Sequence, residues 1–127
     1  MSDMVNSPSH YTKRAATIEP IDVLRWAPFD LGCCLKYISR VGLKDDEVID
    51  WKKARRYLFW AVESYDMFPD HIDWFFAHHG LYLKKFSQFS RCNTNNATDF
   101  FADVSILIKQ NIELLDRTQS ILEQHGE

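Results

Sequence analysis

The chain has 127 residues and a formal net charge of −3 at pH 7. This length suits one domain, and a hydrophobic content of 46% predicts a packed core rather than a disordered chain. The negative charge argues against a protein that coats nucleic acid, because such proteins are usually strongly basic. With only 4 Gly and 4 Pro, the sequence also argues against a turn-rich β fold.

The first two helices expected along the chain are short. A helix should begin at the capping residue Thr17, with proline in its first turn, and end at Pro28. Asp30 is expected to cap a second helix that ends near Gly42. The side chains expected to face inward from the first are Ile18, Ile21, Leu24 and Trp26. Those expected to be buried by the second are Leu31, Cys34, Leu35, Ile38 and Val41.

Three longer helices are expected next. Helical periodicity predicts a third helix over residues 46–68, an aromatic-rich fourth over 70–89, and a long fifth over 97–124. The third helix is expected to bury Ile49 or Val48, Ala54, Leu58, Ala61, Val62 and Tyr65. The apolar stripe of the fifth, which reaches Leu122 and is widened by Leu114 and Ile121, must be covered along the domain or by a second chain. We therefore expect one all-α domain over residues 1–127, about five helices in all, that forms a homo-oligomer.

Cysteine usage and hydropathy point to the cell interior. The 3 Cys form neither a disulfide framework nor a metal motif, so we expect reduced thiols. The N-terminus lacks the apolar core of a signal peptide, and no run of about 18 apolar residues predicts a membrane span. The sequence thus predicts a soluble cytoplasmic protein with no membrane association.

Positive charge is concentrated in the first half of the chain. Lys36 and Arg40 are four residues apart on the second helix, and Lys52 and Arg56 have the same spacing on the third. If the two helices pair antiparallel, these groups and Lys53 can form a joint anion site, because Arg binds phosphate bidentately and Lys supplies a mobile charge. The alternative is an exposed basic face whose charges pair with nearby carboxylates.

Other polar groups offer weaker candidates. His10 and Tyr11 could contact a phosphate and a base, or anchor the N-terminal arm. Glu63 and Asp66 could hold Mg²⁺ with substrate phosphates, but acids near a helix end are commonly surface residues. The histidines lack the spacing of a metal site. The sequence contains no phosphate loop, dinucleotide fingerprint or nucleophile elbow.

The stretches SPSHY, IEPID, FDLGCCLKYISRVGLK and DWKKARRYL resemble, in this order, a small bacteriophage domain family called SaV-like. One podophage member is described as a nucleotide kinase that acts on deoxynucleoside monophosphates. The resemblance covers residues 5–60, whereas 61–127 resemble nothing known. Two departures are Cys33, where the family has Asn, and Trp51, where it has Leu. The matching positions are Pro8, His10, Tyr11, Glu19, Ile21, Asp22, Gly32, Lys36, Tyr37, Arg40, Lys44, Asp50, Lys53, Ala54, Tyr57 and Leu58.

The resemblance implies a phage nucleotide kinase, whose catalysis would consist mainly of positioning and charge neutralisation. The expected catalytic residues are Lys36, Arg40 and Asp50. The expected substrate-binding residues are His10, Tyr11, Gly32, Tyr37, Lys44 and Lys53. One Mg²⁺ is expected at Asp22 and Asp50. Two alternatives stay open: a nucleotide-binding or sequestering protein without catalysis, and a phage inhibitor of a host protein that acts through the C-terminal helices. Nucleic-acid binding is the least favoured.

Overall fold

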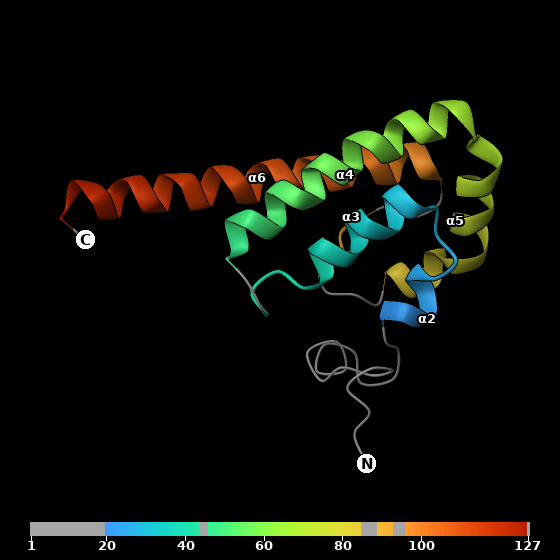
Figure 1. Cartoon of the computed structure of the whole chain (residues 1–127), viewed down its shortest axis with the longest axis horizontal. Coiled ribbons are helices and arrows are strands. Elements are labelled where there is room, and N and C mark those ends of the chain that lie inside the picture. The colour runs from blue at the N-terminus through green and yellow to red at the C-terminus, as the bar shows by residue number, and fades with distance from the viewer. Residues whose placement is uncertain (1–19, 44–45, 85–88, 93–95, 127) are drawn as a thin grey trace, which may run out of the picture.

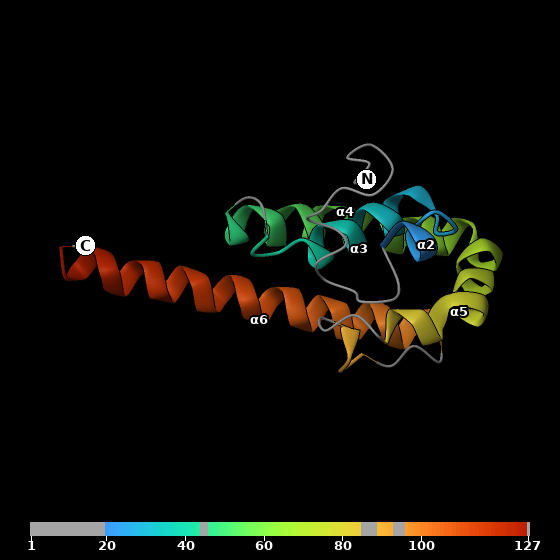
Figure 2. The same ribbon diagram turned by 90° about the horizontal axis from the view of Figure 1, so that it is seen from below.

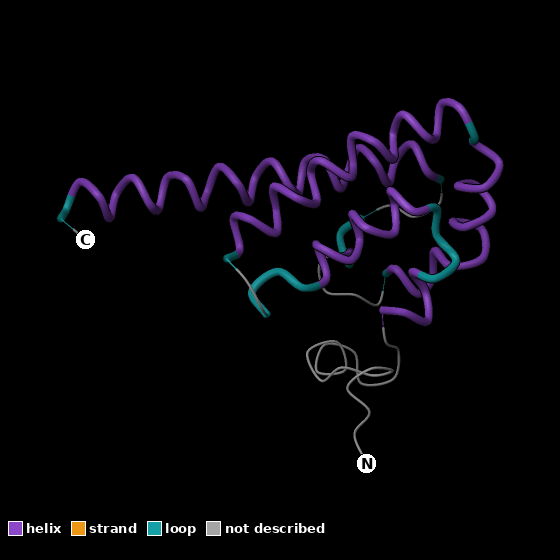
Figure 3. The backbone as a smooth tube through the Cα atoms, viewed as in Figure 1, coloured by secondary structure: helices purple, strands orange, loops and turns teal. Residues whose placement is uncertain are grey.

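The computed structural model describes residues 20–43, 46–84, 89–92 and 96–126. In these segments the regular structure is helical and no strand is found (Figures 1 and 3). The helices are α2 (Pro20–Leu24), α3 (Phe29–Ser39), α4 (Glu47–Met67), α5 (Pro69–Leu83) and α6 (Ala97–Gln124). The prediction of an all-α fold with a long C-terminal helix is therefore confirmed.

The antiparallel pair α3 and α4 is the centre of the fold. α6 returns along α4 in the opposite direction, and α5 makes the turn between them (Figures 1 and 2). The buried side chains of these helices form one core, which includes the stripe expected on α3 and the first half of the stripe expected on α6. The core members on these two helices are Leu31, Cys34, Leu35, Ile38, Ala97, Phe100, Phe101, Val104, Ile108 and Ile112.

Side-chain direction on α2 differs from the prediction. Val23 is buried, whereas Ile21 and Trp26 are exposed, so the prediction is wrong for these side chains, although Leu24 packs against the core as expected. The helix is short and ends at Leu24, so Trp26 lies beyond its end, where its indole stacks on the imidazole of His79. Thr17 and Ile18 lie outside the described residues.

The start of α3 also differs. The helix begins at Phe29, after Pro28, and its N-terminus has no side-chain cap hydrogen bond. Asp30 instead accepts a hydrogen bond from the Ser64 hydroxyl of α4 at 2.8 Å. The α3 helix ends at Ser39, and Gly42 follows with a φ of 79°, a left-handed conformation that glycine adopts without strain.

The buried face of α4 agrees with the prediction along the middle of the helix and differs near its start and at Val62. Ile49 and Val62 are exposed, whereas Asp50 and Trp51 are buried together with Ala54, Leu58 and Ala61. The first turn is capped by Asp46, whose Oδ1 accepts hydrogen bonds from the backbone N–H groups of residues 48 and 49 at 2.8 and 3.4 Å. The burial of Asp50 places an acidic residue of α4 against the end of α3, where part of the candidate site forms.

The last two helices agree with the sequence to different degrees. α5 ends at Leu83, earlier than the expected residue 89, although Phe89 is itself buried in the core. α6 has the expected bounds, but Leu114, Ile121 and Leu122 are exposed. The last turns of α6 project beyond the other helices, so the described part of the chain leaves Ile121 and Leu122 uncovered (Figure 2). Every described helix is too short or too polar to span a bilayer.

His79 gives the packing of α5 a pH dependence that can be measured. Its ring lies 6.3 Å from Trp26 and 5.3 Å from Phe75, between centroids. Burial, with a smaller effect of His78, lowers the pKa of His79. At acidic pH the native state therefore binds fewer protons than the unfolded state. The contribution of His79 to stability is complete above the unfolded pKa of about 6.5 and declines as the pH falls below it.

Urea unfolding at pH 7.5 and pH 5.5 tests this expectation. The wild-type chain should lose stability on acidification, and His79→Phe should reduce that loss because an aromatic ring without a titrating nitrogen takes the same place. His125→Gln serves as the matched control, because this histidine is exposed beyond the end of α6. An equal loss in His79→Phe and in wild type would show that other groups cause the pH dependence.

Candidate functional site

The register between α3 and α4 is fixed by polar contacts near both ends of the pair. At one end the Ser64 hydroxyl donates to Asp30 Oδ2 at 2.8 Å. At the other, Arg40 Nε lies 3.5 Å from Asp50 Oδ1. Since the helices are antiparallel, these two contacts set which side chains meet between them. The basic residues of α3 therefore meet those of α4 at a defined place.

Three basic side chains converge on the ring of Tyr37. From its centroid, Arg40 Cζ lies at 5.2 Å, Lys53 Nζ at 5.3 Å and Lys36 Nζ at 5.6 Å. Cation–π attraction stabilises such an arrangement, but like charges this close repel one another. We call Lys36, Arg40 and Lys53 the cation cluster. Its charge is positive even with Asp50 included, so it favours an anion.

Arg40 is the most enclosed member of the cation cluster. It is only 7% exposed, whereas Lys53 is exposed and Lys36 is half-buried. Its partner Asp50 is fully buried, with 0% exposure. The ion pair holds the guanidinium in place before any ligand arrives, which lowers the entropic cost of binding. We assign Asp50 to positioning of Arg40, because a carboxylate at this depth does not meet a ligand on the surface.

A row of aromatic side chains continues from the cation cluster. Tyr57 stacks on Tyr37 with centroids 5.7 Å apart and an interplanar angle of 17°. Tyr57 also contacts Phe29 at 6.3 Å and Trp60 at 5.4 Å, both at 78°. We call Tyr37, Tyr57, Phe29 and Trp60 the aromatic row. The sequence signals part of it, since Lys53 and Tyr57 lie four residues apart, but gives no indication of Phe29 or Trp60.

The other residues expected at the site lie in different places. Gly32 is on α3, where an added Cβ would lie 3.5 Å from Leu24 O and 3.6 Å from Ala27 Cβ, so it faces the connection from α2. Asp22 is exposed on α2. No group of three or more metal-binding side chains is found in the described segments. His10, Tyr11 and Lys44 lie outside the described residues.

Cys33, which stands where the SaV-like family has Asn, is half-buried on α3. Burial raises the pKa of its thiol, Lys36 opposes this rise, and Asp30 adds to it. The neighbouring Cys34 is fully buried, and burial raises its pKa as well. Because the thiolate is the reactive form, neither cysteine is suited to act as a nucleophile at neutral pH.

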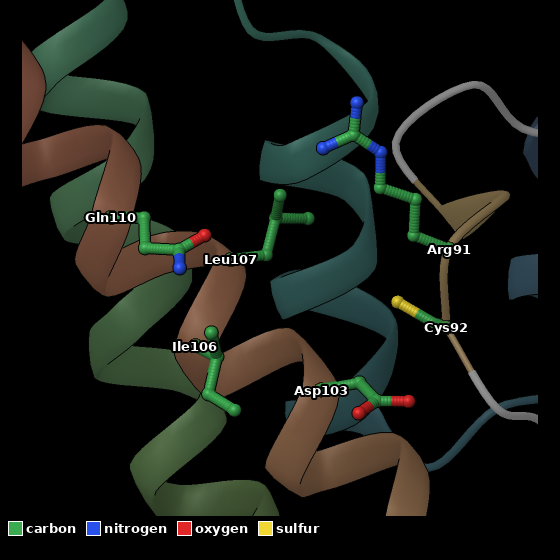
Figure 4. Close-up of a pocket in the computed structure, with 6 residues that line it drawn as sticks. All are labelled: Arg91, Cys92, Asp103, Ile106, Leu107 and Gln110. Carbon is green, nitrogen blue, oxygen red and sulfur yellow. The ribbon is translucent and has the colours of Figure 1, made fainter.

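A hollow of about 160 Å³ lies away from the cation cluster, between α6 and the segment before it (Figure 4). Burial and the Asp103 carboxylate raise the pKa of the Cys92 thiol at its wall to about 11. The Arg91 guanidinium extends away from Asp103. None of the residues expected to bind ligand lines this hollow, which is formed by Arg91, Cys92, Asp103, Ile106, Leu107 and Gln110.

Comparison with known proteins gives one family match, which covers the part of the chain that contains the cation cluster. Residues 5–59 match the model of a family described as a protein of unknown function, DUF3310. The match includes α2, α3, the first part of α4 and the whole cation cluster. Neither a curated protein nor a solved structure matches the chain. The matched family has no known activity, so the match links the chain neither to the SaV-like family nor to a nucleotide kinase.

Proposed function

We propose that this protein binds a nucleotide at the cation cluster and transfers a phosphoryl group to a deoxynucleoside monophosphate. The supporting observation is the convergence of Lys36, Arg40 and Lys53 on one ring. Phosphoryl transfer depends mainly on positioning and on neutralisation of the phosphate charges, which are the tasks that clustered basic side chains perform. The resemblance to the SaV-like phage family, one member of which is described as a nucleotide kinase, supports the choice of nucleotide and the phage setting.

The geometry suggests different roles for the three cations. Arg40 is held by Asp50, so its guanidinium can bind phosphate oxygens in a fixed, bidentate geometry. Lys36 and Lys53 are more accessible and supply mobile positive charges from the two helices. Together the three side chains would contact one phosphate from both helices of the α3–α4 pair.

The two carboxylates expected to hold magnesium lie in different surroundings. Asp50 is fully buried against Arg40, and Asp22 is exposed on another helix. Mg²⁺ is usually bound by one or two carboxylates together with substrate phosphates. We therefore assign no step to a protein-bound Mg²⁺, and the assay below tests the metal requirement directly.

The assay incubates purified protein with deoxynucleoside monophosphates and ATP, with and without Mg²⁺. We expect diphosphate products in at least one condition. Lys36→Ala with Lys53→Ala provides the control, because it removes two of the three cluster charges, leaves the buried pair of Arg40 and Asp50 intact and should abolish turnover. Wild-type turnover no higher than that of this variant would contradict the kinase step.

Nucleotide binding without catalysis is the second candidate, and the burial of Asp50 favours it. A kinase benefits from a carboxylate that accepts the proton of the attacking group or orients it, but Asp50 is enclosed and paired with Arg40. Calorimetry followed by chromatography of the recovered ligand separates the candidates. Tight binding with unchanged ligand supports a sequestering protein, whereas the absence of any binding heat contradicts both.

A further inference from the structure

We propose that the aromatic row forms a second subsite, which holds the base of the nucleotide whose phosphate occupies the cation cluster. This inference rests on the proposed function and adds the part of the surface that holds the base of the substrate. The site would select nucleotides over phosphate compounds that lack a base. The position of the row, its exposure and the charge at its far end support the assignment.

Tyr37 joins the two subsites. Its ring lies near all three cations and also stacks on Tyr57, so it belongs both to the centre of the cation cluster and to the aromatic row. Trp60 and Phe29 both contact Tyr57, which in turn contacts Tyr37. A nucleotide has the same order of groups, with one sugar between its charged phosphate and its aromatic base. Such a ligand can therefore contact both subsites at once.

The outer rings of the row are open to a ligand. Phe29 is 76% exposed and Trp60 is 37% exposed, although both are large apolar side chains beside a charged surface. Exposed aromatic groups next to basic residues are typical of surfaces that bind nucleotides by stacking. Neither ring stacks face to face on Tyr57, since both contact it at 78°. Tyr57 therefore does not cover the ring faces of Phe29 or Trp60, and Arg56 lies over only one face of Trp60.

A further positive charge lies at the far end of the row. Arg56 Cζ is 5.2 Å from the centroid of Trp60. The row is therefore flanked by the cation cluster on one side and by Arg56 on the other. This arrangement favours an anionic aromatic ligand over a neutral one. The net charge of −3 argues against a long nucleic-acid strand as the occupant, so we assign the row to a single nucleotide.

Titration calorimetry with three probes tests the subsite on the full chain: thymidine 5′-monophosphate, 2-deoxyribose 5-phosphate and inorganic phosphate. We expect wild type to bind the nucleotide on the order of tenfold or more tightly than the sugar phosphate, as stacking of one base provides. Phe29→Leu with Trp60→Leu should remove this advantage and leave binding of the sugar phosphate unchanged. Phe59→Leu is the matched control, because Phe59 is 64% exposed on the same helix as Trp60 and outside the row.

The outcomes separate this inference from the proposed function. If nucleotide and sugar phosphate bind equally, the phosphate site stands and the base subsite is overturned. The base subsite is also overturned if Phe59→Leu loses as much affinity as the double variant. If none of the probes binds, both proposals fail. Tighter binding of a ten-residue oligothymidylate than of the mononucleotide would overturn the single-nucleotide assignment. Urea unfolding of each variant checks that the fold is intact.

Discussion

Asp50→Ala is expected to lower the free energy of unfolding by about 3–5 kcal/mol, the cost of removing one partner of a buried ion pair. Arg40 is only 7% exposed and its Nε lies 3.5 Å from Asp50 Oδ1. Without the carboxylate, the largely enclosed guanidinium loses its compensating charge in a place where little water can replace it. Urea unfolding followed by circular dichroism measures the change.

A double variant separates the charge effect from a general packing defect. Arg40→Met with Asp50→Leu removes both charges and keeps apolar volume, so it should recover most of the lost stability. It should not recover phosphate binding, because Arg40 is gone. If Asp50→Ala alone changed stability by less than about 1 kcal/mol, the pair would behave like an exposed ion pair and the positioning role would be refuted.

Lys36→Ala with Lys53→Ala is expected to weaken nucleotide binding by about a hundredfold, since hydrogen bonds to charged groups contribute about 1.5–3 kcal/mol each. The two lysines come from different helices and meet over the ring of Tyr37. Their removal relieves repulsion inside the cluster, so stability should change little. Calorimetry gives the affinity, and urea unfolding gives the stability.

The control for this variant removes the same charge from the same region. Lys52 and Arg55 are exposed on α4 next to Lys53 in sequence but have no part in the cation cluster. Lys52→Ala with Arg55→Ala should therefore retain most of the affinity at a salt concentration near 0.15 M, where charges more than about 8 Å apart are largely screened. An equal loss in both double variants would indicate a diffuse effect of charge instead of a built site.

Helical periodicity predicts well the elements whose buried faces are apolar throughout. The bounds of α6 and the stripe of α3 agree with the structure for this reason. On α4 the same reasoning correctly finds Ala54, Leu58 and Ala61 but wrongly places Ile49 in the core, whereas the structure buries the neighbouring charged Asp50. A buried ion pair cannot be recognised from hydrophobicity alone, since its partner, Arg40, lies on another helix.

For the site as well, the spacing within one helix can be predicted from the sequence, whereas contacts that depend on the register between two helices cannot. The spacing of Lys36 and Arg40 within one helix predicts a shared face, and the antiparallel pairing with Lys53 follows from the short loop. The contact of Phe29 with Tyr57 cannot be predicted, because it depends on the register that the hydrogen bond from Ser64 sets. Pro28 predicts that the preceding helix ends here, but it does not indicate that Phe29 begins α3 directly after it.

A crystal structure of the chain with thymidine 5′-monophosphate is the most direct test of the cation cluster as a phosphate site. We expect the phosphate oxygens within hydrogen-bond distance of Lys36, Arg40 and Lys53, with Arg40 still paired to Asp50. A nucleotide found elsewhere, for example at Arg91 in the hollow beside α6, with no ligand at the cation cluster, would contradict this assignment.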